Sequence, residues 1–340
     1  MRPKKNHQEH PYRMFKVPDD APFELRPSPG KGWGAFATRN IACGSIILKE
    51  KPLFVIPKPH EMITEGDILA AFKQLPPPHK RLFLCLRNNA TTEFLSMREA
   101  FAENSFMIPG RPGIRDKGHG LFLLQSRFNH SCLPNSKIPD IPDEFITRFA
   151  IRDITAGEEI LFCYSPAFES RISSDRHREL RFVCNCPACL VGTPFQQLSN
   201  MRRTLIRGLQ YLILGKDIDG QRQGTALSII VDSKLKHAAE NFSIPLSNRL
   251  IYNLLVMVLL EEEGLLDKFT VERRSPAMLC LPSKFKTQSN AGLAKFALTQ
   301  GTWLEKFCFS LRLWGKGDAA EETIGSLFRI LRELSERPIV

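Results

Sequence analysis

The sequence predicts an α+β fold, because stretches with two different residue patterns follow one another along the chain. Short apolar stretches broken by Gly and Pro fill residues 23–59 and again about 105–166, which is typical of short β-strands and turns. Between them, residues 61–104 space their apolar side chains three and four positions apart, as a helix does. Helical spacing then dominates residues 194–340, so we place a domain boundary near 193–196 and expect an all-helical C-terminal domain beyond it.

In chain order, the expected elements begin after residues 1–22, a polar, proline-containing segment that we expect to be mobile. The first strands are expected in FEL, GAFAT, SIILKE and PLFVI, and the inserted helices in GDILAAFKQL, HKRLFLCLRN and EFLSMREAFAEN. Strands return in EFITRFAIRDI and EEILFCY. The C-terminal helices are expected in QLSNMRRTLIRGLQYLIL, LSNRLIYNLLVMVLLEEE, AGLAKFALTQGTWLEKFCFSLRL and EETIGSLFRILREL.

Composition restricts the class of protein. With 43% hydrophobic and 24% charged residues among 340, the chain is expected to fold as a soluble globular protein. The longest apolar run, Leu250 to Leu260, is interrupted by Asn253 and is too short to span a bilayer, so no membrane partner is expected. No apolar segment follows the basic N-terminus, so we expect no secretory signal. The nine cysteines are then expected to be reduced, in a nuclear or cytoplasmic protein.

The charge of the chain leaves two interpretations open. A formal net charge of +11 suits anionic partners such as nucleic acid or chromatin. A surplus of Lys and Arg spread over solvated faces explains the same number equally well, and no arginine-rich run is present. The acidic run Glu261–Glu263 is similarly ambiguous, because it suits either a basic substrate or a solvated helix face.

Three cysteines lie within six positions in FVCNCPACL, at Cys184, Cys186 and Cys189. Small thiols also pack in cores, but a C-x-C-x-x-C cluster favours zinc, which prefers thiolate ligands in a tetrahedral arrangement. Three ligands leave one position, which is either open for catalysis or filled from elsewhere in the chain. Local sequence does not choose among the eight histidines and the other cysteines, which are Cys43, Cys85, Cys132, Cys163, Cys280 and Cys308.

The glycine stretch GWGAFA, residues 32–37, also fits the G-x-G-x-x-A pattern of dinucleotide-binding folds, with Glu50 as the acid that follows. That fold needs a buried strand before the glycines and a long helix after them. Pro27 and Pro29 precede the stretch, and Gly44 with β-branched residues follows it. A glycine hairpin, or a backbone approached closely by a ligand, fits these neighbours better.

Five segments together resemble the SET-domain protein lysine methyltransferases. They are GKGWGAFAT (30–38), ENSFMI followed by GHGLFLLQSRFNHSC, NHSCLPN (129–135), GEEILFCY (157–164) and FVCNCPAC (182–189). Their order and spacing are similar to the SET-and-MYND branch and its fungal relatives, over about residues 23–190. The region where a MYND zinc finger would lie, about 50–100, has Cys85 as its single cysteine, so the finger is absent.

The resemblance implies a SET domain at 23–166 with a helical insertion at about 61–104, a zinc-bound post-SET segment at 167–193 and the helical domain at 194–340. It implies transfer of methyl groups from S-adenosylmethionine to a lysine of a protein substrate, histone or non-histone, by a monomer. A non-catalytic SET-fold module that binds proteins is the alternative.

The resemblance also assigns roles to individual residues. Tyr164 matches the catalytic tyrosine, and Cys132 matches the fourth zinc ligand. Phe106 and Phe162 match the lysine channel, where Phe162 would influence how many methyl groups are accepted. The implied cofactor contacts are Lys31, Gly32, Trp33, Gly34, Asn104, Asn129, His130 and Phe182. For Tyr164, Phe106 and Phe182, a plain core position is the competing interpretation.

Overall fold

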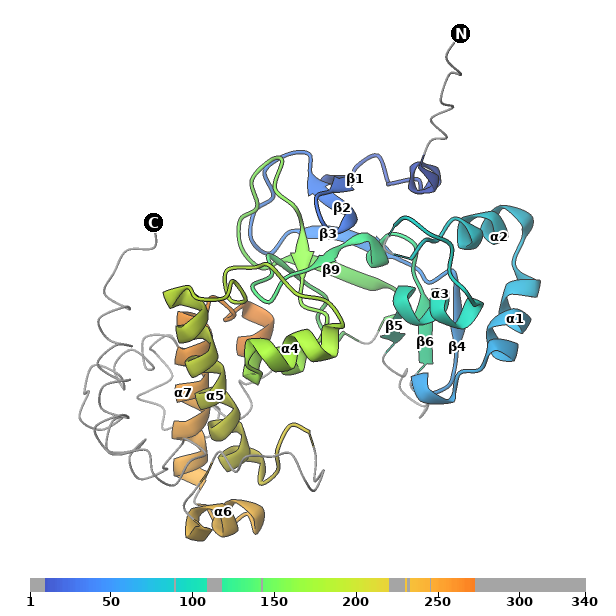
Figure 1. Cartoon of the computed structure of the whole chain (residues 1–340). Helices are drawn as coiled ribbons and strands as arrows, with labels where there is room; N and C mark the ends of the chain where they lie inside the picture. Colours follow the sequence, from blue (N-terminus) through green and yellow to red (C-terminus); the bar gives the residue numbers. More distant parts are fainter. Residues whose placement is uncertain are drawn as a thin grey trace. The chain divides into compact units, whose positions relative to one another are not determined.

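The computed structural model describes residues 10–88, 90–108, 118–141, 143–219, 230, 233–244 and 246–272. Helices and strands are mixed along these residues, which confirms the α+β prediction (Figure 1). The chain divides into two compact units, residues 1–162 and 163–340, and each is described by itself. The domain boundaries expected from the sequence remain predictions.

The glycine stretch forms one strand of a hairpin. β1 (Phe23–Ser28) pairs antiparallel with β2 (Gly32–Ala37), and the turn between them contains Gly30, whose φ of 72° lies in the left-handed region. The next regular element is again a strand, β3 (Ile46–Glu50). A strand rather than a helix after the glycines excludes the dinucleotide-binding interpretation.

Glu50 has a structural role at the end of β3. Its carboxylate accepts the backbone N–H groups of Leu123 and Leu124, both at 3.0 Å, and of Gln125 at 2.7 Å. These bonds hold the start of the short 3₁₀ helix η3 (Gln125–Arg127). Burial raises the pKa of Glu50, although the three backbone donors act in the opposite direction.

The remaining strands of the first unit form small sheets. In one sheet β9 (Ile146–Ala150) lies between β3 and β8 (Ser136–Lys137), and in another β6 (Gly118–Leu121) lies between β4 (Phe54–Ile56) and β5 (Ser105–Ile108). β7 (Asn129–His130) pairs in parallel with β10 (Leu161–Phe162). These short strands surround a common core that includes Ala35, Ile47, Leu121, Phe128 and Ile160, all nearly inaccessible to solvent.

The expected helical insertion contains α1 (Glu65–Gln74), α2 (Pro77–Leu84) and α3 (Met97–Asn104), preceded by the 3₁₀ helix η2 (His60–Met62). Thr64 begins α1 with a capping box, because its hydroxyl accepts from Asp67 N while the Asp67 carboxylate accepts from Thr64 N. Phe101 of α3 stacks on Phe54 of β4 with ring centroids 5.6 Å apart, so the insertion shares the core of the unit.

Residues 10–22 include side chains that are buried within the first unit, and the mobility expected for residues 1–22 stays a prediction. The 3₁₀ helix η1 (Pro11–Met14) places Tyr12 in the core at 1% exposed, and Phe15 is also buried. The Tyr12 hydroxyl donates to Arg87 O at 2.9 Å. The apolar side chains of PYRMF explain this packing, while residues 1–9 lie outside the described residues.

The described elements of the second unit are helical. They are η4 (Pro166–Ser170), α4 (Ser173–Leu180), α5 (Pro194–Leu214), α6 (Ser233–Glu240) and α7 (Leu246–Glu262). Thr193 caps α5 by accepting from Gln196 N at 3.1 Å, and Gly215 ends it with a φ of 70°. α5 and α7 run side by side (Figure 1) and share a core that includes Leu205, Leu209 and Val256. The helices expected after residue 290 lie outside the described residues.

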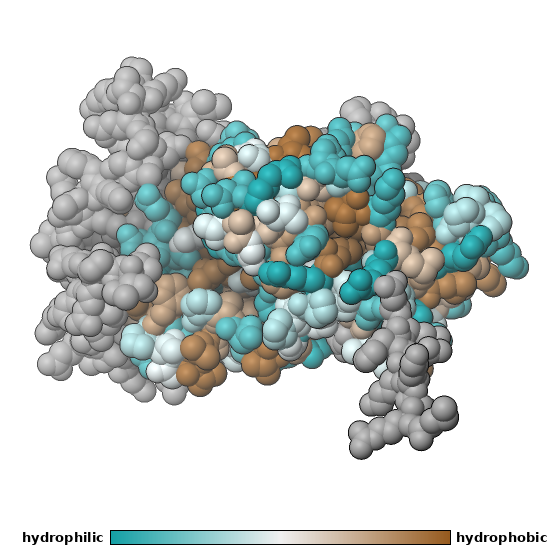
Figure 2. Space-filling model, turned by 90° about the horizontal axis from the view of Figure 1, so that it is seen from above, coloured by the Kyte–Doolittle hydropathy of each residue, from teal (hydrophilic) through white to brown (hydrophobic). Residues whose placement is uncertain are grey.

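One face of the molecule is drawn by residue hydropathy in Figure 2. On the face drawn in Figure 2, brown apolar residues are interspersed with teal polar ones. Scattered apolar side chains of this kind need no special explanation. Within the described part of the chain, every helix is too short or too polar to cross a lipid bilayer.

Candidate functional site

The two central motifs of the sequence meet in the β7–β10 pair. Asn129 lies opposite Leu161 and His130 lies opposite Phe162. Ser131 N donates to Phe162 O at 3.0 Å just beyond the pair. The structure thus brings NHSCLPN and GEEILFCY together within the first unit, in register.

Asn135 fastens the loop that follows β7 back onto β10. Its amide oxygen accepts from Leu161 N at 2.7 Å, and its amide nitrogen donates to Glu158 Oε1 at 3.0 Å and to Glu159 O at 2.9 Å. Asn135 is 1% exposed, so these bonds are made away from water. Asn135 is the last residue of the NHSCLPN motif, and its three hydrogen bonds connect this motif to GEEILFCY.

The carboxylate of Glu159 holds two of the predicted cofactor-binding residues, Lys31 and Asn129. Its carboxylate accepts from Ser28 Oγ at 2.9 Å, from Asn129 Nδ2 at 2.8 Å and from Lys31 Nζ at 3.0 Å. Asn129 Nδ2 also donates to Trp33 O at 3.1 Å. The sequence did not predict this role of Glu159, although the two adjacent acids of the GEEI segment were a possible signal for it. The ammonium of Lys31 therefore has a carboxylate partner inside the protein, and its contact with a cofactor stays a prediction.

Gly34 is required by the same cluster. A Cβ at this position would lie 2.5 Å from Glu159 Oε1 and 2.8 Å from Asn129 Nδ2. Because Gly34 has no Cβ, the side chains of Glu159 and Asn129 can lie close to its backbone. Gly32 has a φ of 79°, which favours glycine at the end of the turn. A close approach of the cofactor to either glycine stays a prediction.

Two further predicted cofactor residues are packed by protein groups. The Trp33 ring stacks on His10 with centroids 4.3 Å apart, and its edge meets Tyr12. Asn104 is 1% exposed at the end of α3, where Nδ2 donates to Ala100 O at 2.8 Å and Oδ1 accepts from Arg127. Both ends of the Asn104 amide are thus engaged inside the protein, which gives this residue a structural role whatever else it does.

The two predicted channel residues lie next to each other. The rings of Phe106 and Phe162 have centroids 6.0 Å apart at an interplanar angle of 35°. Phe106 also meets Phe122 edge to face at 5.7 Å. The structure therefore brings Phe106 of β5 and Phe162 of β10 into one aromatic group, although 56 positions separate them in the sequence.

In the second unit, the predicted catalytic tyrosine meets the predicted adenine-binding ring. Tyr164 and Phe182 pack edge to face with centroids 6.5 Å apart. Each is 46% exposed, so part of both rings is open to a ligand. This exposure argues against the competing interpretation of both residues as plain core side chains.

Cys163, which precedes Tyr164, is a protonated thiol rather than a nucleophile. Its Sγ donates to Ser165 O at 3.2 Å, and burial raises the pKa of the thiol to about 11. At neutral pH the thiolate fraction is therefore negligible.

The three clustered cysteines form a compact group of sulfur atoms. Cys184, Cys186 and Cys189 are buried, and their Sγ atoms lie within 4.8 Å of one another. A turn in which Cys189 N donates to Cys186 O at 2.8 Å brings the last two together. Arg176 of α4, which is fully buried, donates to Cys189 Sγ at 3.1 Å and to Ala188 O at 2.8 Å. Three buried thiols this close together fit zinc, which prefers sulfur ligands in a tetrahedral arrangement.

Cys132, the fourth ligand implied by the resemblance, belongs to the first unit. It is fully buried, and its Sγ lies 3.2 Å from Nε2 of His130. The His130 ring is thus directed at this sulfur. Its role toward a cofactor and the role of Cys132 toward a metal stay predictions.

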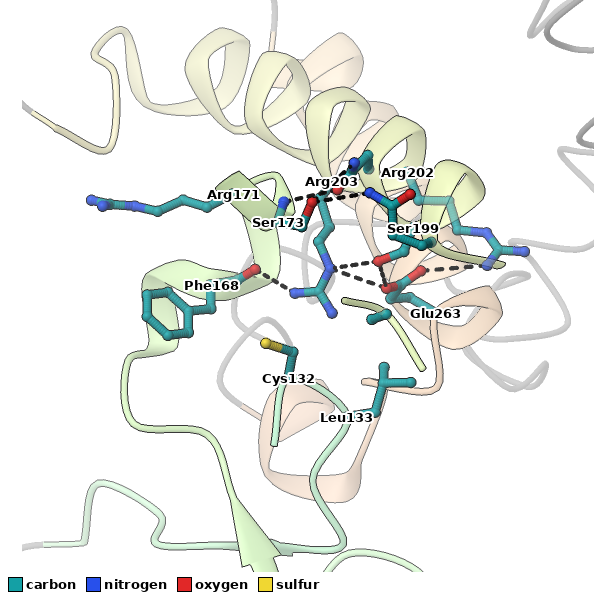
Figure 3. A network of polar contacts seen from close by, with 12 residues as sticks. Cys132, Leu133, Phe168, Arg171, Ser173, Ser199, Arg202, Arg203 and Glu263 are labelled. Atoms are coloured by element: carbon teal, nitrogen blue, oxygen red, sulfur yellow. Dashed lines mark hydrogen bonds and ion pairs between the residues drawn. The ribbon is translucent and has the colours of Figure 1, made fainter. Parts of the chain in front are cut away.

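A buried ionic network stands in the second unit (Figure 3). Glu263, directly after α7, accepts from Arg203 Nε at 3.0 Å, pairs with Arg202 at 3.4 Å and accepts from Ser199. Arg203 also donates to the carbonyl of Phe168 in η4. The side chains of Arg203 and Glu263 are 0% exposed. Glu263 therefore neither faces a substrate nor lies on a solvated surface, in contrast to both interpretations of the acidic run.

Comparison with known proteins finds a family model that matches one stretch of the chain. Residues 32–165 match the family model described as SET domain, which runs from Gly32 of the hairpin to the residue after Tyr164. This part of the chain is therefore similar to SET domains. The resemblance drawn from the five segments is thereby confirmed.

The curated relatives include both fungal and animal proteins. The histone-lysine N-methyltransferase set5 of Schizosaccharomyces pombe is 31% identical over 186 residues, 53% of this chain and 54% of that protein. The protein-lysine N-trimethyltransferase SMYD5 of Homo sapiens is 42% identical over 80 residues, 22% of this chain and 19% of that protein. The histone-lysine N-methyltransferase SMYD3 of Mus musculus is 38% identical over 98 residues, 27% of this chain and 22% of that protein. The matched stretches span about half or less of these relatives' lengths.

Proposed function

We propose that this protein is an S-adenosylmethionine-dependent protein-lysine methyltransferase. The observation that carries the proposal is the register of β7 with β10. This pairing places Asn129 and His130 beside β10, the strand that ends two residues before Tyr164. All of these residues lie within the stretch that matches the SET domain model. The printed names of the relatives, all lysine methyltransferases, support the same reaction.

The residues present fit the cofactor. Phe182 is half-exposed and is held edge to face against Tyr164, so its ring offers apolar surface on which a planar adenine can pack. In this proposal Asn129 and the backbone of Gly32 to Gly34 supply polar groups to the cofactor, with Lys31 and Trp33 on the same stretch. When bound, S-adenosylmethionine supplies an activated methyl group on its sulfonium.

The chain's own residues then position the reaction rather than activate a nucleophile. Methyl transfer is an in-line displacement that needs a neutral lysine amine, so alignment and exclusion of water provide most of the catalysis. The hydroxyl of Tyr164 orients the amine, and Phe106 with Phe162 forms the apolar channel around the lysine side chain. No acid–base dyad is needed for these steps.

We further propose that zinc binds Cys184, Cys186, Cys189 and Cys132, within a post-SET segment at 167–193. The donor chemistry of four thiols supports a closed structural site. A metal there would join the post-SET segment to the SET domain through Cys132. The all-helical C-terminal domain at 194–340 is proposed as a stabilising support for this segment, since Arg203 holds the carbonyl of Phe168.

The substrate is proposed to be a lysine of a protein. The names of two relatives specify histone lysine, so a histone is the first candidate, and a nuclear location follows from it. Action in the cytoplasm, binding of nucleic acid and a monomeric state are further expectations from the sequence. An overall charge of +11 opposes attraction to a basic histone tail unless acidic patches act locally.

Calorimetry with S-adenosylhomocysteine, followed by mass spectrometry of histones and peptide arrays incubated with S-adenosylmethionine, tests the proposal. Binding with methyl transfer is expected. Tyr164→Phe should abolish most transfer while leaving cofactor affinity within about threefold, because the hydroxyl acts mainly in the transition state. Absence of cofactor binding in folded, zinc-loaded protein would instead favour the non-catalytic binding module.

Metal analysis tests the zinc site separately. The purified protein should contain about one zinc per chain. Cys132→Ser should lower this content as much as Cys186→Ser, whereas Cys43→Ser, a change at an exposed cysteine, should leave it unchanged. Full zinc content in folded Cys132→Ser protein would refute the assignment of the fourth ligand.

A further inference from the structure

Arg148 of β9 is a fully buried cation in the first unit, next to the aromatic group of the predicted channel. We propose that Arg148 is a positioning residue that fixes the ring of Phe162 and thereby limits how many methyl groups the lysine channel accepts. This inference rests on the proposed function.

The guanidinium of Arg148 lies between two aromatic rings. Its central carbon is 4.1 Å from the centroid of Phe128 and 4.2 Å from the centroid of Phe162. Phe128 directly precedes β7, and Phe162 is the last residue of β10. One cation therefore packs on a ring from each of the two paired motifs, in a place without water to weaken the attraction.

Hydrogen bonds hold the guanidinium in this place. Nε donates to Gln125 Oε1 at 3.0 Å, one terminal nitrogen donates to Ser136 Oγ at 3.2 Å and the other to Gln125 O at 3.3 Å. Ser136 Oγ in turn donates to Leu161 O at 2.9 Å, which ties the group to β10 itself. A planar fork with fixed donors can satisfy these bonds while its flat faces pack on rings, which a lysine cannot do.

Phe162 is consequently restrained by two neighbours. The guanidinium packs on the ring at 4.2 Å, and Phe106 contacts the same ring with centroids 6.0 Å apart. A ring held in this way gives the channel a fixed width, and each methyl group added to the amine needs extra room. If the guanidinium is removed, the Phe162 ring gains space to withdraw, and we expect the channel to accept more methyl groups.

The test compares Arg148→Met and Arg148→Lys with the unchanged protein on one peptide, at equal extents of reaction. Mass spectrometry should show the ratio of trimethylated to monomethylated product raised at least about threefold in Arg148→Met and less in Arg148→Lys, with cofactor affinity within about twofold. Arg26→Met is the matched control, because Arg26 packs on Phe36 at 4.0 Å but is exposed. The control should leave the ratio unchanged.

A second comparison asks whether Arg148 acts through Phe162. In a Phe162→Leu background, Arg148→Lys should no longer change the product ratio. A full effect in that background, an unchanged ratio in folded Arg148→Met or Arg148→Lys protein, or an equal effect of Arg26→Met would overturn the proposal.

A readout without catalysis separates this inference from the proposed function. Fluorine NMR of fluorophenylalanine-labelled protein should show faster motion of the Phe162 ring in Arg148→Lys than in the unchanged chain. If the ring motion changes but no peptide is methylated, the methyltransferase proposal and the product-limiting role both fail, while the restraint on Phe162 stands. If the ring motion is unchanged, the restraint itself is refuted, whatever the activity.

Discussion

Replacing Glu263 by glutamine should destabilise the second unit by about 3–5 kcal/mol. The substitution keeps the size of the side chain and one acceptor oxygen but removes the negative charge. Arg203 is 0% exposed and Arg202 only 7%, so water cannot compensate either guanidinium for the loss of this carboxylate. This loss of stability is the one expected when a single partner of a buried ion pair is removed. It exceeds the net contribution of the intact pair, because the remaining charge stays buried without a partner.

Glu262→Gln is the matched control, one position away. Glu262 is 31% exposed and lies 3.8 Å from Arg202, so its loss should cost no more than about 1 kcal/mol. Urea unfolding of zinc-loaded protein, followed by helical circular dichroism, would measure both changes. Equal, small effects of the two substitutions would show that the Glu263 network does not stabilise the unit.

Three further predictions concern the first unit and the cofactor. Gly34→Ala should cost about 1–3 kcal/mol in urea unfolding, because the new Cβ would press on Glu159 Oε1 from 2.5 Å. Hydrogen bonds from Lys58 and Thr64 lower the pKa of Asp67 from 3.8 to about 2, so the stability it contributes is present above pH 3.8 and lost as the pH falls toward 2. Melting curves across this range should show that loss, and Asp67→Asn should remove it. Chelation of zinc should weaken cofactor binding by about tenfold or more in calorimetry, and Phe182→Ala should reproduce part of that loss with zinc still bound.

Each of these predictions has its own control. Gly66→Ala in α1 meets nothing nearer than 3.7 Å and should be neutral or stabilising, so an equal loss at Gly66 and Gly34 would remove the argument from crowding. An NMR titration that places the pKa of Asp67 near 3.8 would contradict its role in the capping box. Equal cofactor affinity in folded zinc-free and zinc-loaded protein would mean that Phe182 does not cover the cofactor.

The sequence predicted those strands and helices whose formation depends on neighbouring residues alone. The hairpin around Gly32 follows from glycine conformation, and α1 follows from the spacing of its apolar residues and from the Thr64 cap. The pairing of β7 with β10 was not predicted, because no local pattern in either motif indicates which distant strand it meets. The roles of Cys132 and Tyr164 rest on the family resemblance still.

Three charged side chains could not be predicted to be buried or paired, because the residues that surround them come from distant parts of the chain. Arg148 shares a strand face with Ile146 and Ala150, where alternation predicts an apolar residue, so its burial contradicts the pattern. Glu263 belongs to an acidic run of the kind that usually faces water. Glu159 gains its partners from residues far away in sequence, and no local rule identifies such partners.

The wide sequence separation of the partners around Glu159 has a consequence for how the protein folds. Ser28 and Glu159 are 131 positions apart, and Asn129 and Glu159 are 30 apart. Contacts of such high contact order form slowly, because the intervening chain must lose its freedom before any contact rewards it. The contact between Ser28 and Glu159, which closes the longer of these two loops, is therefore expected to form later in folding than the local glycine hairpin. A nascent chain released before residue 159 would contain the glycine hairpin and the residues of β7 but would lack the carboxylate that accepts from Ser28, Lys31 and Asn129.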